Sequence, residues 1–282
     1  MSATHANWFI TQQVGHGIFL ILEPGHVQSF LVCGSKKAVL IDTGMGFADI
    51  RPVIRSLTSL PVTVINTHWH FDHIGGNVLF NNIGISLHDS ASLTRPLSNS
   101  FLRSLYIDPC LKDGICLPPE FDPDTYAIQS PEPSFFMADG DVVDLGDRKL
   151  YVISTPGHTK GSLSFLDSKT QSLFCGDLVY DGTLYVHFKE SDLGQYLDSL
   201  ERLSGMKNQI SQLFTCHNTP VLSPKFIDKG CDLLAAVKEK RTSDKEVMDW
   251  GRPVIRHEYK DMAVLTKAPG CPGIDLLGFN LG

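Results

Sequence analysis

Four side chains that can bind metal ions lie within six residues of one another in this chain. They are His68, His70, Asp72 and His73. Imidazole and carboxylate groups are the ligands that zinc and similar cations prefer. A single His is most often an ordinary surface or core residue, but that interpretation does not explain three His and one Asp at this spacing. The cluster therefore predicts a metal site.

The cluster directly follows a predicted buried strand. Residues 61–66 are rich in β-branched side chains, and only Thr67 separates them from His68. In an extended loop, residues 68, 70 and 72 would point to one side, with His73 turned to the other. One short loop could then supply two neighbouring metals, an arrangement that enzymes use to activate water.

Four ligands are too few for two metals, and three further candidates follow apolar strands. They are His158, Asp177 and His217. Gly157 and Gly176 permit a close backbone approach at the first two positions. Each candidate is weak by itself, but all three follow a strand as the first cluster does. We therefore predict that they converge on the same site.

The elements around these residues indicate two sheets covered by helices. Strands are predicted at 17–22, at 29–33 paired with 37–42, at 83–88 and in five later segments, the last of them a strand pair at 254–266. Helices are predicted at 48–57, 193–203 and 224–240. Residues 89–136 contain seven Pro, and their apolar residues follow no sustained helical or strand period. This predicts an insertion that acts as a lid or substrate loop. The whole chain, 1–282, is interpreted as a single domain.

Composition narrows the function classes. There are 24 Lys and Arg against 31 Asp and Glu, so the formal net charge is -7, which does not favour binding to nucleic acid or to anionic membranes. The start of the chain lacks the pattern of a secretory signal, and the longest apolar run is too short to span a bilayer. Seven Cys without a C-x-x-C pair favour free thiols. These features predict a cytoplasmic protein with a small-molecule substrate, as a monomer or a dimer.

With these residues in place, the sequence resembles the metallo-β-lactamase superfamily from about Gly15 to Thr219. The superfamily pattern is an early Asp, then H-x-H-x-D-H, then a separated His, Asp and His, and all of these are present. The resemblance implies an α+β fold, a four-layer αββα sandwich of two mixed sheets flanked by helices. It implies two Zn²⁺ ions, with Fe or Mn as alternatives. It assigns His68, His70 and His158 to one metal, Asp72, His73 and His217 to the other, Asp177 to both, and Asp42 to an outer position that fixes the ligand loop.

The activity that the resemblance implies is hydrolysis of an activated acyl bond by a hydroxide that bridges the two metals. Asp72 and Asp177 are the predicted catalytic residues, with Asp72 steering the proton. The run from Asp141 to Tyr185 resembles the acyl-coenzyme A thioesterase branch, so a thioester is the expected substrate, with lactones and β-lactams as variants. Two alternatives stay open: an iron-dependent oxidoreductase or sulfur dioxygenase of the same fold, and a non-catalytic scaffold. His70 argues against the di-iron flavoprotein branch, which usually has Glu there.

Several residues beside the ligands could contact substrate. They are Lys160, Tyr180, Tyr185 and His187, for which surface or packing roles are equally consistent with the sequence. Cys175 and Cys216 adjoin ligands and could suggest a nucleophile. Small buried thiols on strands are the better interpretation, because a metal-activated water needs no protein nucleophile.

Overall fold

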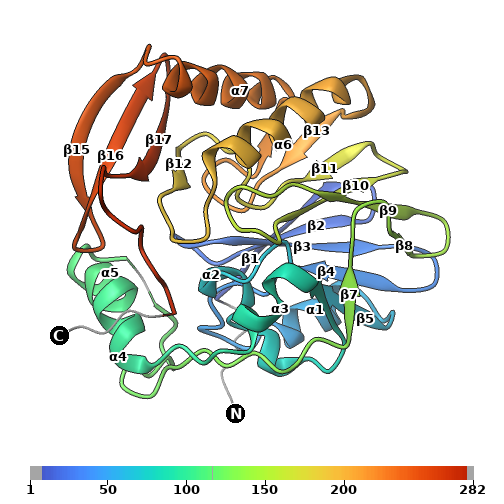
Figure 1. The fold of residues 1–282 in the computed structure, drawn as a ribbon. Helices are drawn as coiled ribbons and strands as arrows, with labels where there is room; N and C mark the ends of the chain where they lie inside the picture. The colour runs from blue at the N-terminus through green and yellow to red at the C-terminus, as the bar shows by residue number, and fades with distance from the viewer. Residues whose placement is uncertain (1–7, 116, 278–282) are drawn as a thin grey trace. The chain divides into compact units, whose positions relative to one another are not determined.

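The structure is a computed structural model that describes residues 8–115 and 117–277 (Figure 1). The chain divides into two compact units. The first runs to Ala138 and includes Val142–Leu150, and the second holds Asp139–Asp141 and the chain from Tyr151 onward. The assignment of the whole chain to one domain stays a prediction.

The first unit contains a seven-stranded mixed sheet in the order β1-β2-β3-β4-β5-β6-β7. The strands β1 to β4 pair antiparallel, and β4 to β7 pair parallel. The predicted pairing of residues 29–33 with 37–42 is confirmed. The bounds are β1 Ile10–Gly15, β2 Ile18–Leu22, β3 Gln28–Cys33, β4 Ala38–Ile41, β5 Val62–Ile65, β6 Ile83–Ser86 and β7 Phe135–Met137, followed by β8 Val142–Asp144.

Helix α1, Arg51–Leu57, packs against this sheet and forms part of its apolar core. It begins three residues later than the predicted helix, since Pro52 occupies its first turn, where a missing N–H costs nothing. Val53 and Ile54 pack in one apolar cluster with strand residues such as Leu40 and Val64. The helical spacing of the apolar residues thus corresponds to a buried face.

The predicted insertion contains short helices. Strand β6 ends at Ser86, whose hydroxyl caps the next helix, so the strand predicted to His88 is two residues too long. The rings of Tyr126 and Phe121, both in the insertion, pack against the ring of Phe47 in the same unit, at centroid distances of 5.1 and 4.6 Å. The helical elements are α3 Leu87–Leu93, α4 Asn99–Leu102, the π-helical turn η3 Arg103–Ile107 and α5 Asp108–Lys112.

The second unit contains two groups of paired strands and two long helices. One sheet runs in the order β14-β13-β11-β10-β9, and a four-stranded sheet runs in the order β12-β17-β16-β15. The helices α6, Leu193–Gly205, and α7, Lys225–Lys238, lie side by side (Figure 1). The strand bounds are β9 Lys149–Ser154, β10 Leu163–Asp167, β11 Ser172–Phe174, β12 Thr183–Val186, β13 Gln212–Phe214, β14 Val221–Leu222, β15 Ser243–Asp249, β16 Arg252–Tyr259 and β17 Met262–Lys267.

Both predicted helices of this unit are present, and their apolar faces pack in one core. Tyr196 and Leu200 of α6 share that core with Leu233 of α7 and Val264 of β17. Strand β15 was not predicted, because its residues are mostly polar and exposed and show no apolar alternation.

Two sequence-based expectations concern the whole chain. Six Cys have free thiols, as expected, whereas Cys116 lies outside the described residues. Among the described residues, no helix has the length and apolar character needed to span a membrane.

Candidate metal centre

The first unit supplies four of the seven predicted ligands from a single edge of its sheet. Strands β4 and β5 are parallel, and Ile41 is in register with Ile65. The carboxyl ends of parallel strands meet at the same edge, where binding residues are commonly placed. The chain therefore delivers Asp42 directly after β4, and His68 three residues after β5, to neighbouring positions.

The predicted extended loop of ligands is partly helical. His70 is the last extended residue, and Phe71–Ile74 form the one-turn helix α2. The expectation that alternate residues of an extended loop would face opposite sides is therefore wrong beyond His70. The turn brings Nε2 of His73 to 3.5 Å from a carboxylate oxygen of Asp72, and the ring of His68 lies 4.1 Å from that of His73.

Asp42 fixes the orientation of this half-site. It is fully buried, and its carboxylate accepts a hydrogen bond of 2.9 Å from Nδ1–H of His73. It also accepts from the backbone N–H and the hydroxyl of Thr67, at 2.8 and 2.7 Å. That hydroxyl lies 3.0 Å from Nδ1 of His68. With both Nδ1 atoms engaged, the two rings present Nε2, which is how outer contacts prepare His for a metal.

Thr67 is the residue that sequence reasoning missed. Its hydroxyl donates to Asp42 and can accept from His68, so it links the outer carboxylate to a second ligand. Its position immediately before the His cluster was the available signal.

The second unit supplies the other three predicted ligands by the same rule. Strands β11 and β13 are parallel, with Phe174 in register with Phe214. Asp177 and His217 each lie three residues beyond these paired positions, so both segments leave the sheet at the same edge. His158 follows strand β9 and donates from Nδ1–H to the carbonyl of Tyr185 at 2.8 Å.

Asp177 contacts both His of the second unit through different oxygens. Oδ2 lies 3.5 Å from Nε2 of His158, and Oδ1 lies 3.2 Å from Nε2 of His217. Two ligands of one tetrahedral zinc, each about 2.0–2.2 Å from the ion, stand about 3.3–3.6 Å apart. The donor chemistry and spacing in this unit therefore fit divalent cations, and so does the pair of His73 and Asp72 in the first unit.

Gly157 is required for the position of His158. Its φ is +139°, and a Cβ there would lie 2.3 Å from the backbone of Tyr196 in α6. We expect Gly157→Ala to destabilise the fold by about 2 kcal/mol or more, because neither the strained φ nor the clash can relax cheaply. Urea unfolding followed by circular dichroism measures this, with Gly205→Ala as the control, where a Cβ meets no atom within 4 Å. Equal stability of the two variants would contradict it.

Comparison with known proteins places the chain in a family. The sequence profile of the metallo-beta-lactamase superfamily matches residues 22–217. The chain belongs to the metallo-beta-lactamase superfamily. The acyl-coenzyme A thioesterase MBLAC2 of Homo sapiens is 31% identical over 214 residues, covering 70% of this chain and 75% of that protein. A hydroxyacylglutathione hydrolase of Trichodesmium erythraeum is 28% identical over 208 residues, covering 70% and 68%.

Solved structures agree on the fold. A metallo-beta-lactamase from Pontibacter korlensis superposes with a TM-score of 0.60 at 17% identity, over 80% of this chain and 99% of that one. The predicted α+β metallo-β-lactamase fold is thereby confirmed. The prediction of an enzyme of the metallo-hydrolase class is confirmed by membership of the metallo-beta-lactamase superfamily and by the relatives' names.

The four predicted substrate-contacting residues of this superfamily member occupy different environments. Lys160 is exposed and Tyr185 is half-buried. Tyr180 is buried, and its hydroxyl donates to the carbonyl of Thr183. His187 is fully buried, with Nε2 2.8 Å from a carboxylate oxygen of Asp249. Substrate contact by these residues stays a prediction, and exposure favours Lys160 and Tyr185.

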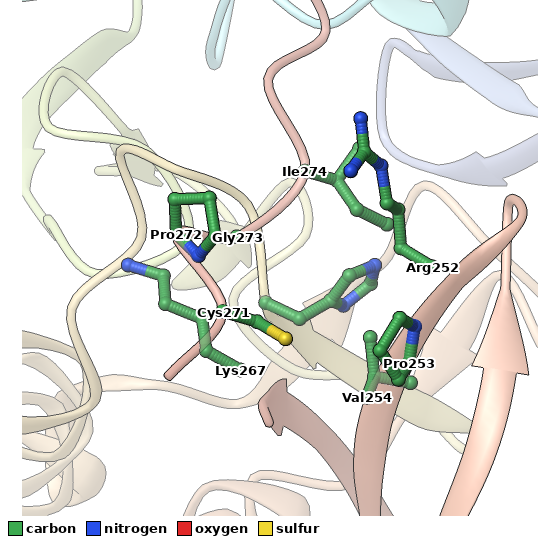
Figure 2. A pocket seen from close by; sticks show the side chains of 9 residues that line it. Arg252, Pro253, Val254, Lys267, Cys271, Pro272, Gly273 and Ile274 are labelled. Carbon is green, nitrogen blue, oxygen red and sulfur yellow. The ribbon is translucent and has the colours of Figure 1, made fainter. Parts of the chain in front are cut away.

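The second unit contains a small cavity of about 50 Å³, which Figure 2 shows from close by. His187 is one of the residues that line it. This volume has room for a few water molecules, since one water needs about 10–15 Å³. Pockets for substrates span about 300–1,000 Å³. The cavity is therefore too small for an acyl substrate. Its other lining residues are Arg252, Pro253, Val254, Lys267, Cys271, Pro272, Gly273 and Ile274.

The two Cys beside ligands are packing residues. Cys175 and Cys216 are both buried. Burial raises the pKa of the Cys175 thiol to about 12, with a smaller contribution from the charge of Asp177. A thiol held neutral is a poor nucleophile, which agrees with the interpretation from sequence.

Proposed function

We propose that the chain is a zinc-dependent hydrolase that uses two metal ions to cleave an activated acyl bond, with a thioester as its substrate class. The observation that carries this proposal is the carboxylate of Asp177, whose two oxygens separately contact Nε2 of His158 and Nε2 of His217. One carboxylate that serves two His through different oxygens is suited to two cations.

The ligand assignment follows the superfamily pattern residue by residue. His68, His70 and His158 would hold one ion, Asp72, His73 and His217 would hold the other, and Asp177 would serve both. Support comes from the donor types in each unit and from the outer contacts that engage Nδ1 of His73 and His158, so that each ring directs its Nε2 toward a carboxylate of the predicted ligand set. Asp42 is the outer residue of this arrangement.

The residues of the chain have distinct tasks in the proposed reaction. Bound divalent ions polarise a carbonyl and lower the pKa of water to about 7. Asp72 and Asp177 neutralise only half of the charge of two such ions, so the site remains cationic and favours an anion that develops on the substrate. Asp72, whose side chain is 18% exposed, is the more accessible carboxylate, and we assign it the handling of the proton.

The thioester class rests on the relatives. The human protein with 31% identity is named an acyl-coenzyme A thioesterase, and the chain spans three quarters of it. The two relatives described above are named for hydrolysis of an acyl-coenzyme A and of a hydroxyacylglutathione, which agrees with the predicted small-molecule substrate. The cytoplasmic location stays a prediction.

Removal and return of metal test the proposal. We expect a chelator to abolish hydrolysis of an acyl-coenzyme A, and one to two equivalents of Zn²⁺ to restore it, because the proposed nucleophile depends on the ions. Metal content of the purified protein is measured in parallel, with a lactone and a β-lactam as comparison substrates. Restoration by iron alone, with uptake of oxygen, would replace this proposal with the oxidoreductase alternative.

A further inference from the structure

Glu23 is a buried carboxyl group outside the ligand set. It follows strand β2 and is 3% exposed. Its Oε2 accepts a hydrogen bond of 2.8 Å from the backbone N–H of Met45. Among the described residues, no Lys, Arg or His forms an ion pair with it. Burial raises the pKa of this carboxyl to about 8, against the lowering effect of the N–H groups of Met45 and Gly46. Such a group is costly to bury, so apolar packing alone does not account for it.

The peptide of Met45 is held on both sides. Glu23 accepts from its N–H, and the hydroxyl of Tyr126, from the insertion, donates to its carbonyl. Gly44 allows this approach, because a Cβ there would stand 3.0 Å from the carboxyl group of Glu23. The loop at residues 42–46 is thus fixed at its far end by two buried polar groups.

The near end of the same loop carries Asp42. This residue has a φ of +61°, a left-handed conformation that is unfavourable for Asp unless its surroundings hold it there. Between the two ends, the carbonyl of Gly44 accepts from the N–H of Gly75 at 2.8 Å, and the N–H of Thr43 donates to the carbonyl of His73 at 2.8 Å. Every link from Met45 to the ligand His73 is therefore a direct hydrogen bond or a peptide bond.

We infer that Glu23 is a positioning residue for the metal centre: it fixes the loop at residues 42–46 so that Asp42 holds the ring of His73. This inference rests on the proposed function for its catalytic consequence. Glu23 does not touch the ligands. It acts through the Met45 peptide and Asp42, whose contact with Nδ1–H of His73 sets which nitrogen the ring presents.

The affinity for Zn²⁺ tests the inference by competition with a chromogenic chelator. Loss of an outer residue typically weakens metal binding 10–100-fold. We expect Glu23→Ala to weaken it about tenfold. Glu23→Gln should weaken it less, since the amide oxygen can still accept from Met45. The control is Asp49→Asn, which removes a carboxylate near the same loop whose partner is Arg51. It should bind Zn²⁺ as the wild type does.

Coupling separates positioning from general destabilisation. If Glu23 acts through Asp42, Glu23→Ala should add almost nothing to the loss that Asp42→Asn already causes. Additive losses in the double variant, or an affinity of Glu23→Ala within twofold of the wild type, would overturn the inference. If Glu23→Ala does not fold, the same cycle is run with Glu23→Gln.

A second measurement is independent of metal binding. In metal-free protein, the Nδ1–H proton of His73 should give a far-downfield NMR signal because it donates to the Asp42 carboxylate. We expect Glu23→Ala to shift or abolish this signal, while Asp49→Asn preserves it. A wild type that shows the signal but binds no divalent ion would refute the proposed function, while loss of the signal in Glu23→Ala would still show that Glu23 positions His73. An unchanged signal in Glu23→Ala would refute the inference alone.

Discussion

Replacement of Asp177 by alanine is expected to lower kcat/KM for a thioester by roughly a thousandfold or more. Asp177 contacts Nε2 of two His through its two oxygens, so on the proposed assignment its loss removes a ligand from both ions at once. It also removes half of the carboxylate charge that the chain contributes. Cys175, two residues away, is no substitute, because burial keeps its thiol neutral. The carboxylate of Asp181, on the same loop, is engaged by the N–H and hydroxyl of Thr219.

The folded state should survive this change. The backbone carbonyls of Asp177 and Leu178 accept hydrogen bonds from the hydroxyl of Tyr196, and these do not depend on the carboxylate. Circular dichroism and metal content are measured beside activity, with Asp198→Ala on the exposed face of α6 as the control. Wild-type activity in a folded Asp177→Ala protein would refute the two-metal proposal. A loss of one metal equivalent with retained activity would favour a single essential ion.

The positions of the candidate ligands at the sheet edges were predictable, because apolar strand segments are followed within a few residues by His or Asp. The β-branched run before His68 and the short apolar run before His217 indicated the positions at which the chain leaves each sheet, and the parallel register places the following residues together. These local patterns identified both half-sites within their own units. The seven ligands could therefore be proposed from the sequence, although their use as ligands still awaits experiment.

Apart from the outer position of Asp42, which the family resemblance implied, the outer contacts could not be predicted, because they depend on tertiary positions. Glu23 precedes Met45 by 22 residues, and the two meet only because β2 and the loop after β4 lie in one sheet region. The helical turn at residues 71–74 was missed because four residues are too few to show a helical period. Asp249 was likewise not identified, since it ends a polar strand that has no apolar alternation.

Arg148 provides the largest expected effect on stability outside the site. Its side chain is 2% exposed, and its guanidinium donates to three backbone carbonyls of the first unit, those of His16, Gly17 and Cys33, at 2.8, 3.2 and 3.1 Å. The sequence indicated this residue only as part of a run that resembles a thioesterase branch. Its observed contacts instead join the turn after β1 to the end of β3.

We expect Arg148→Ala to destabilise the protein by about 3–5 kcal/mol, because it removes charge-assisted hydrogen bonds from buried carbonyls and leaves a cavity. Arg148→Lys should recover part of this loss, since an ammonium can reach fewer of the carbonyls. The midpoint of urea unfolding measures the effect, and Arg95→Ala, an exposed position, is the control. Below the unfolding transition, Arg148→Ala should keep the Zn²⁺ affinity of the wild type. A stability loss under 1 kcal/mol would show that the carbonyls find other donors, and a selective loss of metal affinity would place Arg148 in the support of the site.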